Sequence, residues 1–426
     1  MRITFLLHNA YGLGGTIRTT FNLAGALAGQ GHEVEIASVF RHREKPVLAL
    51  APEVPLRHLV DLRKKSPTYE GEHPLHQRPA KVFPAAESRY RQYSRLTDER
   101  IGRWLAELDA DVVIGTRPGL NVHIARQAPR GLVRVAQEHL TLDTHPARLT
   151  LTLRRLYPRL DAVTTTTDAD AAAYRRRLRL PGVRVQAVPN SVPDTGAAPS
   201  DLTAKYVVAA GRLVPVKRYG DLIRAFGKVV TERPDWGLRI YGGGVQRDEL
   251  AELIEELQLG EYVRLMGQVA PIEPEMAKGS ILAVSSAMES FGMTIVEGMT
   301  VGLPVVSTDC PLGPGEIIDH GKDGLLVPPR DLDAMAAALL DLIGDEDRRR
   351  AMGRAALEKA RHYDPDRIAR VCADLFEQLL AERGGMAGRA RRLGRQAGGL
   401  ALGTAYLCKD VTRAVARRAK RAVRAR

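Results

Sequence analysis

The chain has 426 residues, which corresponds to two or three domains of ordinary size. Hydrophobic residues make up 44% of the chain and charged residues 27%, a composition that is typical of globular proteins and excludes a wholly disordered chain. Three widely spaced cysteines, Cys310, Cys372 and Cys408, exclude a disulfide scaffold and a structural zinc finger. They indicate a reducing, cytosolic compartment.

The positive charge is concentrated at the end of the sequence. The chain holds 63 Lys and Arg against 50 Asp and Glu, a net charge of +13, and residues 383–426 contain thirteen of these cations but one acid, Asp410. The remainder is close to neutral, which disfavours a nucleic-acid-binding core and favours an appended interaction segment. The longest uncharged run, residues 3–17, is too short and too polar to be a membrane span or a secretion signal.

Apolar runs alternate with helix-length segments along the first half of the sequence. These runs predict buried parallel strands, and the segments between them predict crossover helices such as 17–28. The predicted strands are 3–7, 34–39, 111–115, 133–136 and 161–164. The pattern predicts a doubly wound α/β domain over residues 1–193, with an insertion at 66–103 that carries one long basic helix.

A stretch rich in Gly, Ala, Pro and Ser, residues 194–200, predicts a linker. The alternation then restarts, with strands predicted at 206–210, 238–241, 263–265, 281–284 and 304–307. We therefore predict a second α/β domain over 201–361 and a C-terminal helix over 362–382 that packs back toward the first domain. Two such domains in tandem place a ligand at the carboxyl ends of their strands.

Two glutamates lie eight residues apart, Glu289 ahead of a predicted helix and Glu297 inside it. Between them, Ser290-Phe291-Gly292-Met293 would lie at the helix N-terminus, where free backbone N–H groups and the helix dipole favour phosphate. Carboxylates beside such an anion site fit the hydroxyls of a sugar and a ribose that flank a diphosphate. Two glutamates on a solvated helix are the alternative interpretation of this spacing by itself.

Two loops that follow predicted strands add groups suited to phosphate. The sequence Gly211-Arg212-Leu-Val-Pro-Val-Lys217 places two cations after a strand. The Arg212 guanidinium can bind two phosphate oxygens as a planar fork, and the Lys217 ammonium acts as a point charge. The turn Gly12-Leu-Gly14-Gly15-Thr16 lets backbone approach a phosphate closely. It does not match the dinucleotide fingerprint, because Ile17 occupies the third glycine position. Simple turn geometry is the alternative explanation for each loop.

In content and order, these features resemble the family 4 retaining glycosyltransferases of GT-B fold. The resemblance spans residues 1–382 and includes the segment 309–319, Asp-Cys-Pro-Leu-Gly-Pro-Gly-Glu-Ile-Ile-Asp. It implies an α/β fold of two Rossmann-like domains facing a central cleft, the first binding the acceptor and the second the nucleotide sugar. Segments 313–318 and 323–327 look most similar to members that build bacterial wall teichoic acids and polysaccharides.

The resemblance implies a role for each matching residue of the donor site. Arg212 and Lys217 would hold the donor diphosphate, and Gly14 and Gly15 would approach it from the other domain. Glu289, with the amides of Ser290, Phe291, Gly292 and Met293, would bind the donor sugar hydroxyls. Glu297 would bind the ribose.

One histidine is implied as a further catalytic residue. His139 follows a predicted strand in the sequence Gln137-Glu138-His139 and matches the histidine that such enzymes place beside the donor sugar. A structural histidine at a strand end is the alternative. Asn190 lies in a Pro-Asn-Ser hinge where the family has Pro-Asn-Gly, so no donor contact is assigned to it.

No metal and no cofactor is expected besides the nucleotide sugar as co-substrate. The pair Asp109-Ala-Asp111 precedes a predicted strand, and Asp168-Ala-Asp170 stands where a helix N-cap belongs, so both are interpreted as local structure. Two cations and a helix N-terminus can neutralise a leaving diphosphate without a metal ion.

The basic tail repeats apolar residues at intervals of seven and four between residues 386 and 426. This pattern predicts an amphipathic helix on an anionic membrane surface. A disordered solvated tail is the first alternative. Nucleic-acid binding is the second, and it is disfavoured because the tail contains a single aromatic residue, Tyr406.

These features predict a cytoplasmic hexosyltransferase, peripheral at the inner face of the plasma membrane. It would move a hexosyl unit from a nucleotide diphosphate sugar to an envelope glycan, a teichoic acid or a lipid-linked acceptor. A UDP-sugar is the favoured donor. One rival is a nucleotide-sugar epimerase of the same fold, which the basic tail and the Glu289–Glu297 pair disfavour. The other is a non-catalytic membrane-surface scaffold, in which Arg212, Lys217 and both glutamates would not all be expected to persist.

Overall fold

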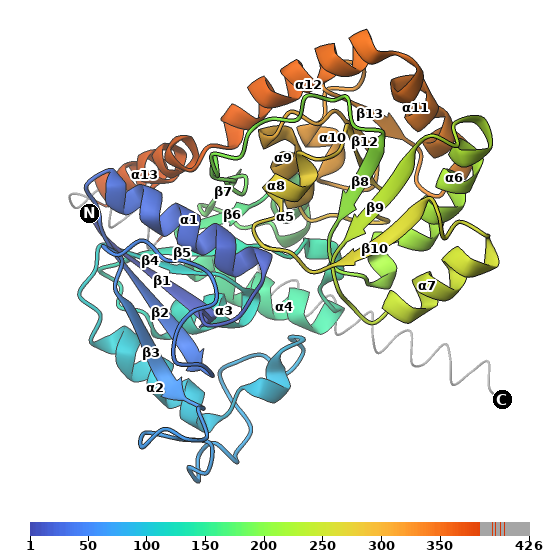
Figure 1. Cartoon of the computed structure of the whole chain (residues 1–426). Coiled ribbons are helices and arrows are strands. Elements are labelled where there is room, and N and C mark those ends of the chain that lie inside the picture. The colour runs from blue at the N-terminus through green and yellow to red at the C-terminus, as the bar shows by residue number, and fades with distance from the viewer. Residues whose placement is uncertain (384–393, 395–396, 398–400, 402–403, 405–426) are drawn as a thin grey trace, which may run out of the picture. The chain divides into compact units, whose positions relative to one another are not determined.

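The computed structural model describes residues 1–383 together with 394, 397, 401 and 404 (Figure 1). The amphipathic helix predicted over 386–426 lies outside the described residues. The chain divides into two compact units. Unit 1 comprises Met1–Val188 and the chain from Ala369 onward, and unit 2 comprises Pro189–Ile368.

Unit 1 is built on a seven-stranded sheet with the strand order β3-β2-β1-β4-β5-β6-β7. The strands are β1 (Arg2–Asn9), β2 (Glu33–Arg41), β3 (Leu56–Asp61), β4 (Val112–Gly115), β5 (Val133–Glu138), β6 (Ala162–Thr165) and β7 (Arg184–Ala187). Every pairing is parallel, so all strands end at one edge of the sheet. The five strands predicted from apolar runs are confirmed, and β3 and β7 are additional strands at the two sides of the sheet.

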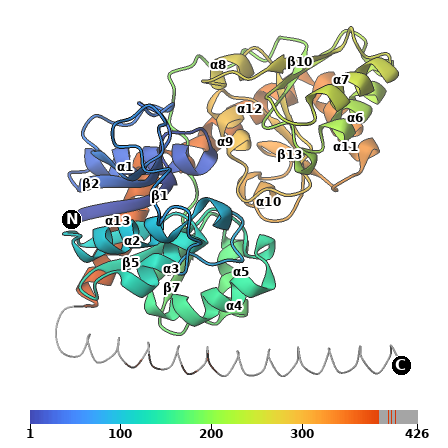
Figure 2. The same ribbon diagram turned by 90° about the horizontal axis from the view of Figure 1, so that it is seen from below.

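Helices cover both faces of this sheet. Helix α1 (Gly15–Gly29) lies along one face and α2 (Arg95–Ala106) along the other (Figures 1 and 2). Three further helices follow, α3 (Pro118–Gln127), α4 (Ala147–Leu156) and α5 (Asp168–Leu178). The buried cluster between sheet and helices includes strand residues Val39, Val113 and Val163 and helix residues Leu105 and Leu120. Each such side chain contributes about 1.5–3 kcal/mol on burial, which is why the apolar runs identify the strands.

The expected long basic helix in the insertion at 66–103 is wrong. The chain from 62 to 93 consists mostly of turns, and α2 begins only at Arg95. A continuous helix is excluded by Pro67, Pro74, Pro79 and Pro84. Ser94 then caps α2, because its hydroxyl accepts a hydrogen bond from the Thr97 amide while the Thr97 hydroxyl accepts one from the Ser94 amide.

Unit 2 is built on a six-stranded sheet with the order β10-β9-β8-β11-β12-β13, again with parallel pairings throughout. The strands are β8 (Tyr206–Ala210), β9 (Gly237–Tyr241), β10 (Val263–Gly267), β11 (Ile281–Val284), β12 (Val305–Thr308) and β13 (Gly324–Val327). The helices are α6 (Tyr219–Glu232), α7 (Arg247–Glu256), α8 (Glu273–Met276), α9 (Met293–Thr300), α10 (Pro314–Ile317), α11 (Leu332–Gly344) and α12 (Glu346–Ala360). Two doubly wound α/β domains in tandem are therefore confirmed.

Helix α13 (Pro365–Ala381) begins in unit 2 and belongs to unit 1 from Ala369 onward. The end of this segment is held by polar contacts within unit 1. Arg184 donates to Glu382 at 2.9 Å, and Arg383 forms an ion pair with Asp161. Among the described residues, no helix combines the length and the apolarity that crossing a membrane requires.

Candidate active site

Unit 2 brings its candidate residues to the carboxyl edge of its sheet. In the order β10-β9-β8-β11-β12-β13, the chain reverses direction across the sheet at β8, and such a switch point opens a crevice at the strand ends. The loop after β8 carries Arg212 and Lys217, and the loop after β11 carries Glu289. Topology alone therefore places two cations and a carboxylate on the two sides of this point.

Lys217 and Glu289 form a direct ion pair. Lys217 Nζ lies 2.5 Å from Glu289 Oε1, and the same oxygen accepts a hydrogen bond from the Ser286 hydroxyl at 2.6 Å. The two side chains of the pair are only 18% and 12% exposed. Because Oε1 accepts from both donors, the carboxylate is fixed in orientation, and no bond to Oε2 occurs within the part of the chain that the structure describes.

Backbone bonds hold this pair in place. Ser285 donates its hydroxyl to Lys217 O at 2.9 Å, and the amide of Ala287 donates to Val216 O at 2.8 Å. The hydroxyl of Thr308, at the end of β12, donates to Ser286 O at 2.6 Å. The loops after β8 and β11 are thus bound to each other and to the next strand, so the backbone positions from which Lys217 and Glu289 extend are fixed relative to each other.

Helix α9 begins directly after Glu289. Gly292 is its N-cap, with a φ of +107° that only glycine adopts easily. A second glycine lets another loop pass close by, since a Cβ at Gly313 would lie 1.7 Å from Phe291 O. Ser290 and Met293 are half-buried on either side of the buried Phe291 and Gly292. The predicted position of residues 290–293 at a helix N-terminus is therefore confirmed.

Glu297 lies inside α9, as predicted, and its side chain is 8% exposed. This burial argues against the alternative in which Glu297 is an ordinary solvated helix residue. A carboxylate is rarely so buried unless it is paired, bound to hydrogen-bond donors or used by a ligand.

Arg212 extends from a loop that other glycines shape. Gly211 has a φ of +148° and donates its amide to Tyr241 O at 2.9 Å. The loop after β9 runs so close to it that a Cβ at Gly242 would lie 1.8 Å from Gly211 O, and a Cβ at Gly244 would lie 2.3 Å from Leu213 O. The Arg212 side chain is exposed, and it forms no ion pair with any residue in the described part of the chain.

Two residues that the sequence did not single out lie beside this group. The buried ring of Tyr219 approaches Gly211, and burial, reinforced by the negative charge of Glu289, raises the pKa of its hydroxyl. Burial, again reinforced by Glu289, raises the pKa of the Cys310 thiol to about 11. Both groups are therefore neutral at pH 7, and the charge of the site comes from its Arg, Lys and Glu residues.

In unit 1, the glycine turn after β1 leads into α1. Gly14 is the N-cap of α1, with a φ of 162° that belongs to extended backbone, and Gly15 is the first helical residue. A Cβ on either glycine would meet nothing within 4 Å. Neither backbone conformation nor packing inside the chain thus requires glycine at these two positions.

His139 directly follows β5 and is half-buried at the same edge of the unit 1 sheet. Its neighbour Glu138 has a fully buried side chain. Asn121 Nδ2 donates to Glu138 Oε1 at 2.8 Å, the hydroxyl of Tyr157 donates to the same oxygen, and His145 Nε2 lies 3.8 Å from Oε2. The sequence analysis did not identify this buried carboxylate, although it stands next to the candidate histidine.

The loop that begins at His139 is tied to this network. His145, near the end of this loop, has its Nε2 3.4 Å from the Tyr174 hydroxyl, and the amide of Leu142 donates to Asp170 Oδ1 at 3.0 Å. Burial raises the pKa of Asp170 to about 6, in spite of the hydrogen bond from Leu142. Glu138 and Asp170 thus accept hydrogen bonds from an amide side chain, a hydroxyl and a backbone amide, whereas Glu289 in unit 2 is paired with a lysine.

The two Asp-x-Asp pairs have local partners, as expected. Asp111 accepts from the Arg2 amide at 2.7 Å, and Asp109 forms an ion pair with Arg2. The N-cap of α5 is Thr167 rather than Asp168, and its side chain accepts from the Asp170 amide. Within the described residues, no group of three or more His, Cys, Asp and Glu side chains has the arrangement of a metal site.

The structure thus brings the candidate residues together in two separate groups. The group in unit 2 consists of Arg212, Lys217, Glu289, Ser290, Phe291, Gly292, Met293 and Glu297. The group in unit 1 consists of Gly14, Gly15 and His139. Asn190 is 8% exposed near the start of unit 2. Ser286, which binds Glu289, could have been recognised from its position three residues earlier in the same conspicuous stretch.

Both halves of the chain match models of known protein families. Residues 13–195 match the family model described as Glycosyltransferase Family 4, and residues 195–359 match the model described as Glycosyl transferases group 1. An exopolysaccharide phosphotransferase of Streptomyces coelicolor is 34% identical over 406 residues, which cover 92% of this chain. The chain spans 43% of the length of that relative.

Two further likenesses extend over nearly the whole of the proteins concerned. A phosphatidyl-myo-inositol mannosyltransferase of Mycolicibacterium smegmatis is 30% identical over 377 residues, which cover 84% of this chain and 92% of the relative. A crystal structure of S. aureus TarM with alpha-GlcNAc-glycerol and UDP superimposes with a TM-score of 0.69 at 16% identity and covers 88% of this chain and 99% of TarM. This last likeness shows the fold.

Proposed function

Since this chain belongs to the glycosyltransferases of GT-B fold, we propose that it is a retaining hexosyltransferase that uses a nucleotide diphosphate sugar without a metal ion. A UDP-sugar is the favoured donor, and the favoured acceptor is a cell-envelope polymer or a lipid-linked glycan. The observation that carries the proposal is the half-buried Lys217–Glu289 pair at the N-terminus of α9, with Arg212 beside it at the carboxyl edge of unit 2.

In this proposal each charged residue of unit 2 binds a different part of the donor. Arg212 and Lys217 bind the diphosphate, whose negative charge grows as the glycosidic bond breaks, and preorganised cations stabilise that charge. The amides at the start of α9 add to this stabilisation. Glu289 uses its open oxygen to bind donor sugar hydroxyls, and Glu297 binds the ribose.

Unit 1 contributes through backbone and one imidazole. Because the fold does not require Gly14 and Gly15, their small size is best explained by a ligand that approaches the turn closely. His139, at the same edge of the sheet, is proposed to contact the donor sugar. The loop that begins with His139 is held in place by its contacts with buried acids, His145 with Glu138 and Leu142 with Asp170.

The relatives guide the choice of donor and acceptor. TarM was solved with UDP and alpha-GlcNAc-glycerol, and the mycobacterial relative is named for mannosyl transfer to a phosphatidylinositol. A further relative, from Campylobacter jejuni, is named for transfer of N-acetylgalactosamine to a diphospho-undecaprenol-linked glycan and is 34% identical over 42% of this chain. We propose that the enzyme meets acceptors of this kind at the inner face of the plasma membrane, where residues 386–426 would contact anionic lipid.

Donor turnover with and without acceptor tests the proposal. The full chain is incubated with individual nucleotide sugars, and nucleotide release and sugar products are measured by chromatography. A transferase releases more nucleotide when an acceptor glycan is present, and NMR of the product shows the anomeric configuration of the donor. An epimerase instead forms an isomeric sugar without acceptor, and a scaffold does neither.

A matched pair of variants and a chelator complete the test. We expect Glu289→Gln to abolish most transfer, whereas Glu252→Gln, an exposed residue on α7, leaves transfer unchanged. Activity should persist in excess chelator. Loss of activity that Mg²⁺ or Mn²⁺ restores would contradict the metal-independent mechanism, and inversion of the anomeric configuration would contradict retention.

A further inference from the structure

We propose that the loops after β2 and β3 in unit 1 form a subsite for a phosphate group on the acceptor, with Lys64 and Lys65 as its contacting residues. The ligand is called an acceptor on the strength of the proposed function. The subsite itself is argued from the contacts of the two loops.

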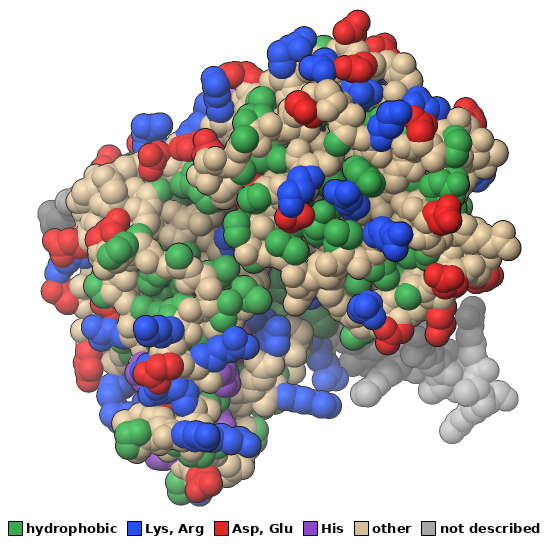
Figure 3. Space-filling model, in the orientation of Figure 1, with side chains coloured by type: hydrophobic (Ala, Val, Ile, Leu, Met, Phe, Trp, Pro, Cys, Tyr) green, Lys and Arg blue, Asp and Glu red, His purple; other side chains and the backbone are tan. Residues whose placement is uncertain are grey.

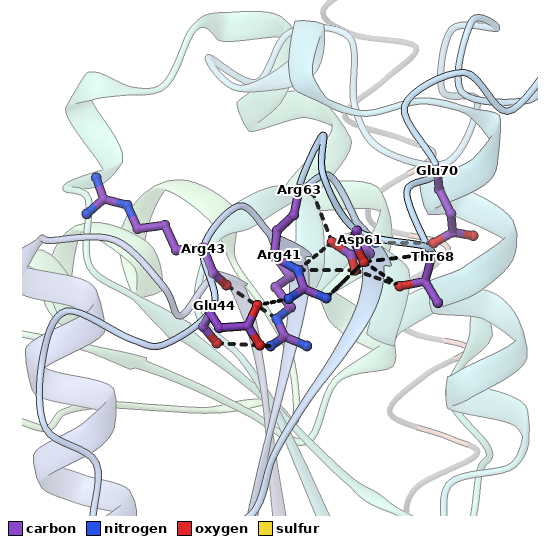
Figure 4. Close-up of polar contacts among 8 residues, drawn as sticks. Arg41, Arg43, Glu44, Asp61, Arg63, Thr68 and Glu70 are labelled. Carbon is purple, nitrogen blue, oxygen red and sulfur yellow. Dashed lines mark hydrogen bonds and ion pairs between the residues drawn. The ribbon is translucent and has the colours of Figure 1, made fainter.

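A buried carboxylate organises the loop after β3. Asp61, the last residue of β3, is 1% exposed and accepts hydrogen bonds from five donors (Figure 4). Three come from Arg63, through its amide and two guanidinium nitrogens, and the others from the hydroxyls of Ser66 and Thr68 at 2.8 and 2.7 Å. The hydrogen bonds from Arg63 lower the pKa of Asp61, so the carboxylate stays charged and the loop keeps its shape at any ordinary pH.

Lys64 and Lys65 stand at the tip of this loop. The Ser66 amide donates to Arg63 O at 2.8 Å, which closes a four-residue turn with the two lysines as its central residues. Both side chains are exposed, and neither forms an ion pair with an acid in the described part of the chain. Asp61 binds the first and last residues of the turn, so two adjacent ammonium groups are displayed from a rigid base.

The loop after β2 adds two more cations beside the turn. Glu44 pairs with both Arg41 and Arg63, so its charge is already used (Figure 4). Arg43 extends away from these contacts (Figure 4), and the side chain of Lys45 is exposed as well. Figure 3 shows that Lys and Arg side chains gather on this part of unit 1, around β2 and β3. Asp61 and Glu44 are matched by Arg63 and Arg41, which leaves Arg43, Lys45, Lys64 and Lys65 without an ion-pair partner among the described residues.

The position of the turn fits an acceptor. Residues Arg41 and Asp61 are paired in register at the ends of β2 and β3, at the same edge as the turn after β1. Because β3 is two strands from β1 and neighbouring strands are about 5 Å apart, the loops after β1 and β3 leave the sheet about 10 Å apart along this edge. An acceptor whose reacting hydroxyl lies near the turn after β1 would therefore need its phosphate at a distance on the order of 10 Å from that hydroxyl.

Phosphate is the group that such a turn selects. Lysine ammonium groups act as mobile point charges and bind tetrahedral oxyanions from several directions, whereas planar carboxylates are matched best by arginine forks. The ammonium groups of two adjacent lysines repel each other, and a phosphate that binds both of them offsets that repulsion. A phosphate monoester or diester fits this chemistry, whether it belongs to a lipid or to a soluble glycan chain.

Lysine reactivity measured by mass spectrometry tests the subsite directly. The full chain is acetylated in the presence of a soluble glycerol phosphate oligomer, of phosphatidylglycerol–phosphatidylcholine vesicles or of polyglutamate. We expect phosphate to slow acetylation of Lys64 and Lys65 about tenfold, as charge-assisted contacts of ordinary strength would. Lys322, an exposed lysine of unit 2, serves as the internal control and should react at an unchanged rate.

The two phosphate probes distinguish the source of the group. Protection by the oligomer alone would assign a polymer-borne phosphate, and protection by the vesicles alone would assign a lipid-borne one. Equal protection by polyglutamate, or protection of Lys322 to the same degree, would show unspecific charge attraction and overturn the proposal. No protection of Lys64 and Lys65 by either phosphate probe would overturn it as well.

Kinetics with a matched variant extend the test to the reaction. We expect Lys64→Gln with Lys65→Gln to raise KM for a phosphate-bearing acceptor about tenfold, the scale of two exposed ion contacts, without changing kcat. Donor hydrolysis without acceptor and KM for a phosphate-free acceptor should stay the same. The control removes two exposed cations from helices of the same unit, Arg103→Gln with Arg126→Gln, and should change neither constant.

These measurements separate the subsite from the proposed function. If no nucleotide sugar is turned over by the wild-type chain, the transferase proposal fails, but the acetylation result still decides whether the phosphate site exists. If transfer occurs and the lysine variant behaves like its control with a phosphate-bearing acceptor, the subsite is wrong while the transferase proposal stands.

Discussion

The carboxyl edges of the two sheets carry similar sequence signals for different physical reasons. In unit 2, glycines after β8 and β9 are required by the chain itself, since a Cβ at Gly242 would lie 1.8 Å from Gly211 O. In unit 1, Gly14 and Gly15 have room for a Cβ. The acids differ as well, because Glu289 is paired with a lysine whereas Glu138 is buried among neutral donors and a histidine. A glycine turn is therefore informative about a ligand only where the fold does not need it.

The sharpest way to break this comparison is to add a methyl group in unit 2. Gly242→Ala forces a Cβ against Gly211 O at a φ of +147°, so we expect unit 2 to lose at least about 3 kcal/mol of stability. Thermal and urea unfolding measure the loss. Gly344→Ala, at the end of α11 with open space around it, is the control and should unfold like wild type. Normal stability of the Gly242 variant would refute the structural role.

The next largest effect concerns the cations that these glycines position. Arg212→Ala and Lys217→Ala should each lower kcat by about 10²–10³, the cost of removing one preorganised group at developing charge. Donor affinity should fall less than turnover, because the charge on the diphosphate grows in the transition state. Steady-state kinetics show this split, with Lys228→Ala on α6 as the control for loss of a lysine. Near-normal turnover in both variants would remove the diphosphate assignment.

Unit 1 should show its difference in the pH dependence of stability. Burial raises the pKa of Asp170 from 3.8 to about 6, so the folded state holds its proton more tightly than the unfolded state. This group therefore contributes stability below pH 4 that is lost as the pH rises to 6, about 2–3 kcal/mol in all. Asp170→Asn keeps the oxygen that binds the Leu142 amide but removes the titration. Denaturant unfolding gives the free energy of unfolding of wild type and variant from pH 4 to 7, and the difference between the two should change by this amount over that range. A difference that stays constant with pH would contradict the prediction.

The smallest effect tests the glycines that the fold does not require. Gly14→Ala or Gly15→Ala should leave the melting temperature unchanged or slightly higher. Alanine lowers the conformational entropy of the unfolded chain and has a higher helix propensity than glycine. Donor affinity should nevertheless fall about tenfold if a ligand passes close to the turn. Calorimetric titration with UDP-sugars measures it, and Gly29→Ala at the end of α1 is the control. Unchanged donor affinity in both variants would leave these glycines without a role.

Most of the strands that sequence analysis recovered are central strands buried on both faces, although the partly exposed edge strand β10 was recovered and the mostly buried β13 was not. Central strands such as β4 and β5 read as continuous apolar runs, because helices cover them from both sides. The side strands β3 and β7 are partly exposed and mix charged with apolar residues, as in Leu-Arg-His-Leu-Val-Asp and Arg-Val-Gln-Ala. No periodicity distinguishes such short mixed segments from loops. In the insertion at 66–103, the limits of the helix depend on single prolines and on the Ser94 cap rather than on a periodic pattern.

The candidate site was recoverable to a similar degree. Glu289, Glu297 and the residues between them lie in one stretch, so their relation to a helix N-terminus could be predicted from spacing. Partners from distant parts of the chain could not be predicted in this way. Tyr157 and Asn121 meet Glu138 because β5 and the helices around it pack together, and nothing in the local sequence of Glu138 indicates that its carboxylate is buried. The donors to Asp61 are Arg63, Ser66 and Thr68, which are close in sequence, but they surround the carboxylate only because the loop folds back on it.

Helix α13 has a consequence for the order in which the chain acquires its structure during synthesis. Unit 1 is discontinuous, since its last helix follows the whole of unit 2 and is joined to β6 and β7 through Asp161 and Arg184. On a ribosome, residues 1–188 emerge first but must wait about 180 residues for this helix, which at about 5–20 residues per second is on the order of 10–40 seconds. Unit 2 is contiguous and can finish first. The part of unit 1 that packs against buried α13 side chains such as Leu375 and Phe376 is therefore open to chaperones during this interval.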